Sequence, residues 1–332
     1  MLRSLVISAA LLLALVVRAG ATEAVWVGSA NGNWSDPANW STGVVPTSTT
    51  DVHVDFNPAQ NSAIQAGADI SMGSLTIDAG DSLVIPNNTI NASGKAQING
   101  TLSFAGTPTQ GILPNVTVGP TGEIQLTKST SQLNYLGYVA PGGLVHGGGT
   151  VLNSSSTNDG EIRADLAAGP LSTPLGPIGG ALTNNGRLTA TGGGWLKIAA
   201  QLQSSGTLRG GRIEAYPNSR VTLGGSGGTT NINDAVLASI DDADPLTAAP
   251  IFELAGVVLS NPTIEGDIQI PAYSGGCGAN RLVPPQCWLL MATTILSSIA
   301  LISISGEHIS AIRPRQMLAR RPLSRNRLCW RS

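Results

Sequence analysis

A short pattern that recurs in the middle of the chain limits the fold more than any other feature. Each copy has a pair of small polar residues, a glycine, and a run in which apolar residues lie two positions apart. The copies contain Gly160, Gly186 and Gly206, which are 26 and 20 residues apart. Apolar residues at a spacing of two indicate a strand with one buried face, and glycine allows a sharp turn because it tolerates positive φ. Repeats of this length are typical of solenoid proteins, in which each repeat forms one coil.

The same alternation continues over most of the chain. It runs from Ser74 to about Pro271, with turns that contain Gly, Asn and Pro between the apolar pairs. We predict an all-β fold in which residues 74–271 form a single-stranded right-handed parallel β-helix. The side chains predicted to point inward include Leu75, Ile77, Leu83, Ile85, Leu102, Phe104, Val116, Val118, Ile124, Leu126, Leu188, Leu196, Ile198, Ile213, Ala215, Val221 and Leu223.

An antiparallel β-sandwich is the alternative fold. The turn at Asn99 and Gly100 lies between two alternating runs, and Asn-Gly is also a preferred turn of a β-hairpin. Two segments rich in tyrosine and proline, 128–145 and 165–181, interrupt the alternation. In the solenoid they are predicted to be loops that project from one face.

Residues 22–73 differ from the rest of the chain because they hold three of the six tryptophans, Trp26, Trp34 and Trp40. The end coil of a solenoid exposes its core and needs a cap, and buried indole rings supply a large apolar area. We therefore predict an N-terminal cap that contains these three rings. The alternative is a platform on which the rings stack against a sugar.

The order of motifs in this segment allows a more specific comparison. Trp26-Val27-Gly28 is followed by Gly32-Asn33-Trp34-Ser35, then Asn39-Trp40-Ser41, then Gly43-Val44-Val45-Pro46. This opening resembles that of exported bacterial β-solenoid surface proteins, among them autotransporter-like passengers and proteins with a PEP-CTERM sorting tail. The resemblance implies a β-solenoid at the cell surface. Residues 226–332 are too short and too poor in strand patterns for the outer-membrane barrel of an autotransporter.

The first 21 residues are predicted to be a secretion signal. Arg3 provides a positive charge, residues 5–17 an apolar segment, and residues 19–21 the small side chains before a cleavage site. The apolar segment is too short to span a bilayer. We expect cleavage after Ala21 and export of the mature chain from Thr22.

The composition changes abruptly after about residue 272. Val283, Pro284 and Pro285 precede an apolar run at 288–305 and an arginine-rich end. This order resembles a PEP-CTERM sorting signal, which implies a membrane sortase that cuts near these three residues and an apolar helix that transiently anchors the chain. The tail departs from that pattern at Pro285, where Glu is expected, and in its long basic end. Residues 272–332 are therefore either a sorting signal or a disordered segment.

The charge of the chain excludes one class of partner. Residues 22–280 have 19 Asp and Glu against 8 Lys and Arg, a net charge of −11. Nucleic-acid binding needs a basic surface, so nucleic acid is not expected as a partner. The cysteines are Cys277, Cys287 and Cys329. Cys277 and Cys287 either form a disulfide in an oxidising compartment or remain free thiols, and the cysteine spacing matches no zinc site.

No motif for catalysis or cofactor binding is present. The chain has no Gly-x-Ser-x-Gly, His-Glu-x-x-His or phosphate-binding loop, and His53 and His146 are isolated in the sequence. We expect no cofactor. The cluster of Asp241, Asp242 and Asp244 is either a solvated turn or a calcium site, and no EF-hand spacing supports calcium.

These observations favour a non-catalytic exported protein of the cell surface or the extracellular matrix, with an adhesive role toward a polysaccharide or the matrix. The alternative is a polysaccharide lyase or hydrolase, because some parallel β-helices carry such activity. That chemistry needs acidic and basic side chains that converge at one site. A cleft that gathers two carboxylates and a basic residue would favour the enzyme, whereas flat polar faces would favour the scaffold.

Overall fold

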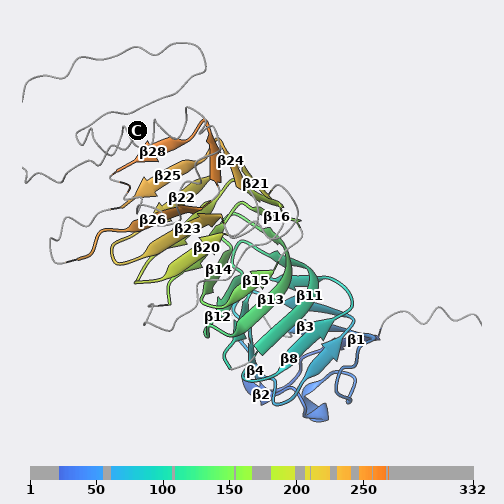
Figure 1. Ribbon diagram of the computed structural model, residues 1–332. Coiled ribbons are helices and arrows are strands. Elements are labelled where there is room, and N and C mark those ends of the chain that lie inside the picture. Colours follow the sequence, from blue (N-terminus) through green and yellow to red (C-terminus); the bar gives the residue numbers. More distant parts are fainter. Residues whose placement is uncertain are drawn as a thin grey trace, which may run out of the picture.

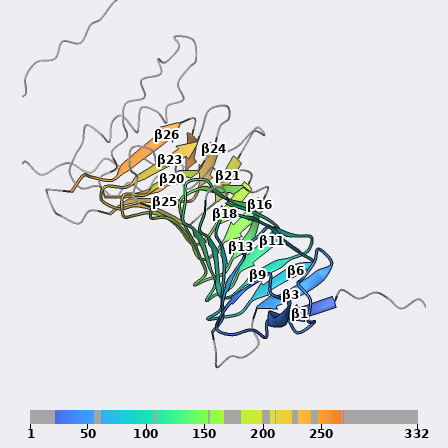
Figure 2. The same cartoon turned by 90° about the horizontal axis from the view of Figure 1, so that it is seen from below.

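The chain forms an elongated stack of β-strands. The computed structural model describes residues 22–266 and residue 268, apart from 55–60, 107–108, 153–154, 167–180, 199–205, 210, 225–229, 241–246 and 256. The stack begins at β1 and β2 and ends at β27 and β28 (Figure 1). Seen from a direction at right angles, the strands still follow one another along the same axis (Figure 2).

Two long sheets run along the stack, and the chain alternates between them. The path of the first sheet is β1 (Thr22–Val25), β3 (Thr50–Val54), β6 (Ser74–Ile77), β9 (Ala96–Ile98), β11 (Thr109–Val118), β13 (Ser131–Val139), β16 (Ser155–Asn158), β18 (Ala181–Asn184), β21 (Gly206–Arg209), β24 (Thr230–Asn233) and β27 (Val257–Ser260). The second sheet is β2 (Asn31–Asn33), β4 (Ala63–Gln65), β7 (Ser82–Ile85), β10 (Thr101–Phe104), β12 (Glu123–Leu126), β14 (Leu144–Gly147), β17 (Glu161–Ala164), β19 (Arg187–Ala190), β22 (Arg212–Ala215), β25 (Val236–Ser239) and β28 (Thr263–Glu265).

A third side closes many of the coils. In the early coils it consists of β5 (Ile70–Met72), β8 (Thr89–Ala92) and β15 (Thr150–Leu152), which join the first sheet through the long strands β11 and β13. In the late coils it is a separate sheet of β20 (Trp195–Ile198), β23 (Arg220–Gly224) and β26 (Ile251–Ala255). The described part also has one short 3-10 helix, η1 (Pro37–Asn39), which Asp36 caps.

All strand pairs between the named strands are parallel, which confirms the predicted right-handed parallel β-helix. The alternative β-sandwich is wrong. The turn at Asn99 and Gly100 does not connect a hairpin, because β9 before it and β10 after it belong to different sheets. A parallel strand needs its partner one full coil away in sequence, so each connection must travel around the stack.

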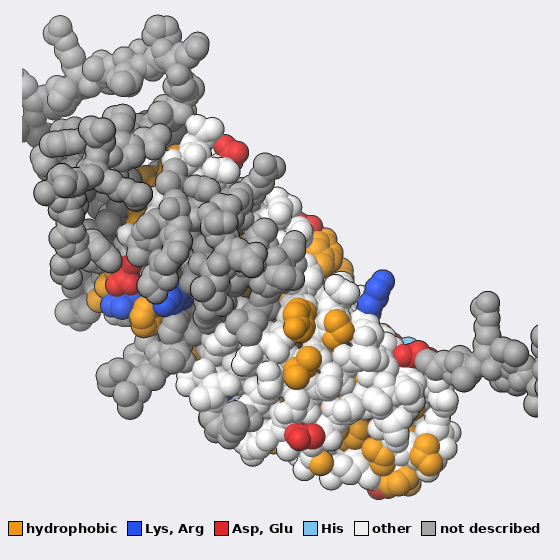
Figure 3. All heavy atoms as spheres, turned by 45° about the vertical axis from the view of Figure 1, so that its right-hand side comes forward, with side chains coloured by type: hydrophobic (Ala, Val, Ile, Leu, Met, Phe, Trp, Pro, Cys, Tyr) orange, Lys and Arg blue, Asp and Glu red, His pale blue; other side chains and the backbone are white. Residues whose placement is uncertain are grey.

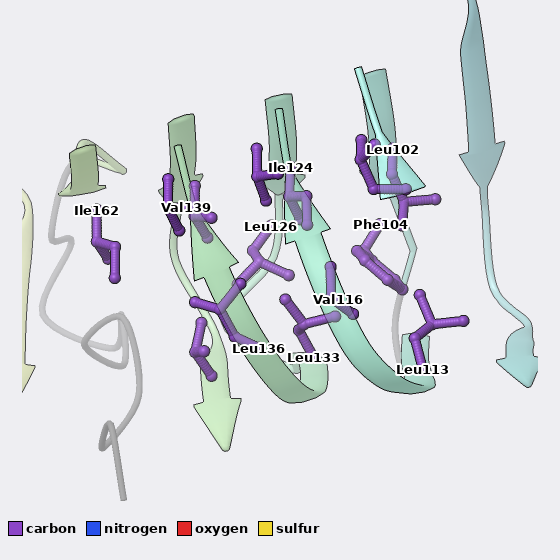
Figure 4. Close-up of a cluster of buried hydrophobic side chains, with 14 of the residues drawn as sticks. Leu102, Phe104, Leu113, Val116, Ile124, Leu126, Leu133, Leu136, Val139 and Ile162 are labelled. Atoms are coloured by element: carbon purple, nitrogen blue, oxygen red, sulfur yellow. The ribbon is translucent and has the colours of Figure 1, made fainter. Parts of the chain in front are cut away.

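The core is a column of aliphatic side chains that the strands direct inward. Figure 4 shows this for the middle coils, where Leu102, Ile124 and Ile162 follow one another in a row along the stack, from right to left in the view. The other labelled side chains of that view, Phe104, Leu113, Val116, Leu126, Leu133, Leu136 and Val139, fill the space between the sides. The inward residues named above, from Leu75 to Leu223, are all buried, so the alternation at spacing two identified this part of the core correctly.

The recurring glycines are needed for a reason that differs from the predicted one. Gly160 and Gly186 are not among the described residues with positive φ. Instead, a Cβ on Gly186 would lie 2.1 Å from the carbonyl oxygen of Gly160 on the neighbouring coil. Only glycine allows the two turns to approach this closely.

The third copy of the pattern lies on a different side of the coil from the first two, contrary to the prediction. Gly160 and Gly186 precede β17 and β19 of the second sheet, and the register continues from Gly186 to Gly211, which precedes β22. Gly206 instead begins β21, which belongs to the first sheet. Strands on both sides of a coil follow a glycine and alternate in the same way, so the local pattern does not distinguish the sides.

The predicted loop at 128–145 is also wrong. Half of it is β13, a nine-residue strand that pairs with β11. Its alternation is interrupted at Tyr135, which has a φ of 65° and shifts the register. The second predicted loop, 165–181, falls mainly on residues outside the described part.

The three early tryptophans form the predicted cap. Trp26, Trp34 and Trp40 are at most 2% exposed, and Trp40 meets the other two rings edge-on at centroid distances of 5.1 Å and 4.7 Å. The Trp40 indole also donates a hydrogen bond to the carbonyl of Trp34 at 2.8 Å. Rings buried in this way cannot stack against a sugar, so the platform is excluded for these three residues.

Parallel pairing starts earlier than residue 74. Strands β1 and β2 pair with β3 and β4 in the two long sheets, so the capping segment forms coils of its own. At the other end, Ile264 of β28 occupies an inward register position next to Leu237 but is 38% exposed. No described strand packs beyond β28, which accounts for that exposure.

Candidate functional site

Many ionisable side chains of the middle and late coils lie on the outer face of the second sheet. They occupy the first and third positions of its strands, which alternate with buried residues such as Ile124, Ile162 and Ile213. Parallel register places equivalent positions of successive coils side by side. One row contains Gln125, His146, Arg163, Thr189 and Glu214, and the neighbouring row contains Glu123, Leu144, Glu161, Arg187 and Arg212.

His146 lies between two carboxylates. Its Nε2 is 2.8 Å from Oε1 of Glu123 on β12, and its Nδ1 is 2.9 Å from Oδ2 of Asp165 just after β17. The hydrogen bond to Asp165 raises the pKa of His146, Glu123 adds to this, and burial opposes it. Since both ring nitrogens face acceptors, the protonated imidazolium with two N–H donors is the form that fits the site.

Arg163 joins the same group. Its Nε donates to Oδ2 of Asp165 at 3.0 Å, and its Nη1 is 3.8 Å from Glu161. Burial alone would raise the pKa of Asp165, but the hydrogen bonds and charges of His146 and Arg163 lower it. Asp165 therefore stays ionised and holds two cations from two coils.

Glu214 is the centre of a second group, two coils further along. Its side chain is 6% exposed, and it accepts hydrogen bonds from Arg187 at 2.5 Å and from Arg212. Burial would raise the pKa of Glu214, but the two guanidinium groups lower it. Arg212 also reaches Glu265 of β28 at 2.7 Å, and Arg187 reaches the hydroxyl of Tyr216 at 3.3 Å.

These groups neutralise one another, which limits the chemistry that they can perform. A general base needs a free lone pair within reach of substrate, and both His146 nitrogens are engaged by carboxylates. In the described part of the chain no group of three or more His, Cys, Asp or Glu side chains is arranged to hold a metal ion. The other histidine in the described part of the chain, His53, also pairs with a carboxylate, with its Nε2 2.7 Å from Asp78 on the next coil.

Sequence reasoning missed these ion pairs because the partners are distant in the chain. His146 and Glu123 are 23 residues apart, and Arg187 and Glu214 are 27 apart. His53 and His146 are isolated in the sequence but not in space. The signal that could have found them is charge at equivalent outward positions of consecutive coils, and it becomes visible only after the register is assigned.

Several of the predicted sites lie outside the described residues. They are the cleavage position after Ala21, the aspartates Asp241, Asp242 and Asp244, the cysteines Cys277 and Cys287, and the sorting motif of Val283, Pro284 and Pro285. Within the part that the structure does describe, no helix has the length and apolar character needed to cross a membrane.

Part of the stack is similar to a known protein family. Residues 25–162 match a family described as a domain of unknown function (DUF8693). The matched region contains the tryptophan cap and the coils up to β17, so it ends inside the His146 group, between Glu123 on one side and Asp165 on the other. No curated protein and no solved structure matches the chain.

Proposed function

We propose that this chain is a non-catalytic exported protein of the cell surface or the extracellular matrix, in which the β-solenoid is a rigid scaffold with an adhesive role. The observation that carries the proposal is the pairing of ionisable groups between neighbouring coils. His146 bridges Glu123 and Asp165, and Glu214 bridges Arg187 and Arg212. The acids and bases in these pairs are already bound to one another, whereas a reactive site would need them free. The pairs also link neighbouring coils.

The rest of the outer surface supports the same proposal. Where Figure 3 shows described residues, most of the surface is neither charged nor hydrophobic, and Lys and Arg side chains are visible at only a few places on it. Flat polar faces suit a protein that remains soluble and presents an extended surface. The proposed location rests on the predicted signal at 1–21 and on the resemblance of the opening motifs to exported solenoid proteins.

The alternative of a polysaccharide lyase or hydrolase would have to use the His146 group, because there two carboxylates meet basic side chains. To separate the two functions, the mature chain and the His146→Gln variant should be incubated with a panel of acidic and neutral polysaccharides. The assays are release of reducing ends and of unsaturated sugar. We expect no product from either protein and a lower thermal stability of the variant. Turnover by the wild type that His146→Gln abolishes would overturn the scaffold proposal.

The proposed export and sorting need their own test. Cells that produce the full chain can be fractionated and probed with antibodies against the body and against the tail. A body found outside the cell and shortened to about residue 283 is expected if a membrane sortase acts near Val283, Pro284 and Pro285. A full-length protein that stays inside the cell would rule out the proposed location.

A further inference from the structure

One tryptophan does not belong to the cap or to the core. The structure describes four of the six tryptophans, and three of them are the buried cap rings. The fourth, Trp195, is the first residue of β20 and is only half-buried, whereas Leu196 and Ile198 of the same strand are buried. The alternation of β20 therefore directs a large aromatic ring outward from the third side of the late coils.

The register of the third sheet surrounds this ring with polar groups. Trp195 is level with Arg220 and Ile251, and the next outward row is Lys197, Thr222 and Glu253. The indole Nε1 donates to the Thr222 hydroxyl oxygen at 2.7 Å, and the Thr222 hydroxyl donates to Glu253 at 2.8 Å. This chain of hydrogen bonds runs across three coils and fixes the orientation of the ring.

One face of the Trp195 indole is covered by Arg220. The guanidinium carbon of Arg220 lies 4.9 Å from the ring centroid, a distance typical of a cation–π contact. Arg220 is on β23, and β20 is the edge strand of this sheet among the described residues. The face opposite Arg220 therefore lies on the side where no described strand pairs with β20.

The outer face of β20, β23 and β26 carries a positive charge, although the molecule as a whole is acidic. Arg220 is 3.5 Å from Glu253, so these two charges largely cancel. Lys197 has no ion-pair partner among the described residues. Its neighbour in the same outward row is Thr222, which has no charge. The Lys197 ammonium, unpaired among the described residues, therefore lies beside a fixed indole in a body with a net charge of −11 over residues 22–280.

We propose that the outer face of β20, β23 and β26 binds a glycan that contains carboxylated sugars. The apolar face of a pyranose ring packs on Trp195, the Lys197 ammonium pairs with the sugar carboxylate, and Arg220 and Glu253 offer hydrogen bonds to hydroxyl groups. Charge complementarity selects the acidic sugar, because the charge that the described residues leave unpaired is a cation. This inference extends the adhesive part of the proposed function and rests on it for the presence of glycan around the protein.

Single-stranded nucleic acid also combines stacking with negative charge, but this face suits it less well. Channels for single strands have successive aromatic residues and a basic track along the backbone. Here the described face offers one aromatic ring and one unpaired cation. A glycan in which charged and neutral sugars alternate carries far fewer charges per unit length than a nucleic acid, and the acidic body of the protein repels it less.

The test measures binding of the purified mature chain by calorimetry. The probe is an oligosaccharide of alternating glucuronate and N-acetylglucosamine, and the matched neutral probe is an oligosaccharide of N-acetylglucosamine alone. We expect binding of the first and at least tenfold weaker binding of the second. Lys197→Gln should weaken binding of the acidic probe about tenfold, the effect of losing one charge-assisted hydrogen bond. Lys128→Gln removes an exposed lysine elsewhere and should change nothing.

A second pair of variants tests the ring. Trp195→Ala should reduce binding more than Trp195→Phe, which keeps a smaller aromatic face and loses the hydrogen bond to Thr222. Comparing them separates stacking from the structural role of the indole. Equal affinities for the two probes, equal effects of Lys197→Gln and Lys128→Gln, or tighter binding of an oligothymidylate would overturn the proposal. Failure of binding leaves the polysaccharide turnover assay unaffected, so the scaffold proposal and this site are judged separately.

Discussion

The coils up to β12 and the coils from β14 onward share an aliphatic column but differ in the side chains that surround it. In the first four-residue strands of the second sheet, the last inward position holds Ile85, Phe104 and Leu126. In the later strands the same column continues as Gly147, Ala164, Ala190 and Ala215. The second sheet thus contributes much less apolar volume in the late coils, while its middle column remains large, from Leu83 to Leu237.

Two features offset this loss in the late coils. The separate third sheet brings Leu196, Val221, Leu223 and Phe252 into the core. The outer face of the second sheet also gains ion pairs: four of the described Arg residues, Arg163, Arg187, Arg212 and Arg220, are paired. In the early coils Lys95 and Lys128 are the described Lys and Arg residues, and both are exposed. The early coils therefore depend on large apolar side chains and the late coils on smaller ones with charged pairs across them.

The largest effect should come from the cap, where the early coils concentrate their aromatic area. Trp34→Ala removes a ring that is 1% exposed and leaves a cavity beside Trp40, which should cost about 3–5 kcal/mol. In a repeat protein the loss is expected to be local, so hydrogen exchange of β1 to β4 should be measured together with urea unfolding. Val44→Ala, at a residue 62% exposed in the same segment, is the control and should have little effect.

The late coils should be more sensitive to charge. Glu214→Gln keeps the size of the side chain but removes the carboxylate that Arg187 and Arg212 share, although Arg212 keeps its pair with Glu265, and we expect a cost of about 1–3 kcal/mol. The control is Glu253→Gln, because Glu253 is 33% exposed and its Arg220 partner lies at 3.5 Å. That change should cost less than about 1 kcal/mol. The stability of both variants should be measured by thermal melting. A control that loses as much stability as Glu214→Gln would contradict the comparison.

His146 should make stability depend on pH. Its pKa in the folded chain is raised above the ordinary value of 6.5, so its contribution is fully present below pH 6.5 and is lost as the pH rises through the raised pKa. Asp165 has the opposite sign, because its lowered pKa makes its contribution disappear as the pH falls through that value.

The pH dependence can be read from melting temperatures measured across neutral and alkaline pH. Wild type should lose stability as His146 deprotonates, and His146→Gln should be less stable at low pH with a flatter profile. His53→Gln is the matched control, because one ring nitrogen of His53, Nε2, lies within hydrogen-bonding distance of a carboxylate, that of Asp78, whereas both nitrogens of His146 do. Parallel profiles for wild type and His146→Gln would show that the imidazolium does not hold these coils together.

Much of the fold could be predicted from the sequence because its cause is local. Alternation at spacing two identified residues such as Leu188 and Leu223 as inward, and a group of tryptophans before the repeats identified the cap. The assignment of Gly206 failed because strands on both sides of a coil share one pattern. The segment 128–145 has the sequence features of a loop because tyrosine and proline interrupt its alternation, yet β13 tolerates this with a bulge at Tyr135.

The candidate site was harder to predict for a different physical reason. Its parts are ordinary charged residues whose partners lie one coil away, at separations of 19 residues for His146 and Asp165 and 27 for Arg187 and Glu214. No local motif encodes such a pair. Trp195 illustrates the same limit, since its partners Thr222 and Arg220 come from the next strand of a sheet that the sequence pattern did not separate from the other two.

The smallest effect should come from the bulge at the boundary between the two regions. Tyr135 has a φ of 65°, and Asn115, which precedes the paired residue on the neighbouring coil, has a φ of 53°. Asparagine tolerates this left-handed region better than a bulky aromatic residue does. Tyr135 is 50% exposed, so removing its side chain loses little buried area. Tyr135→Asn should therefore stabilise the chain by less than about 1 kcal/mol. The same substitution at Tyr138 should destabilise it, because Tyr138 lacks positive φ and its hydroxyl donates to Asp159 at 2.8 Å. If Tyr135→Asn lowers the urea midpoint instead, the ring must contribute contacts that outweigh the backbone strain, and the early coils would depend on exposed aromatic area as well as on the buried cap.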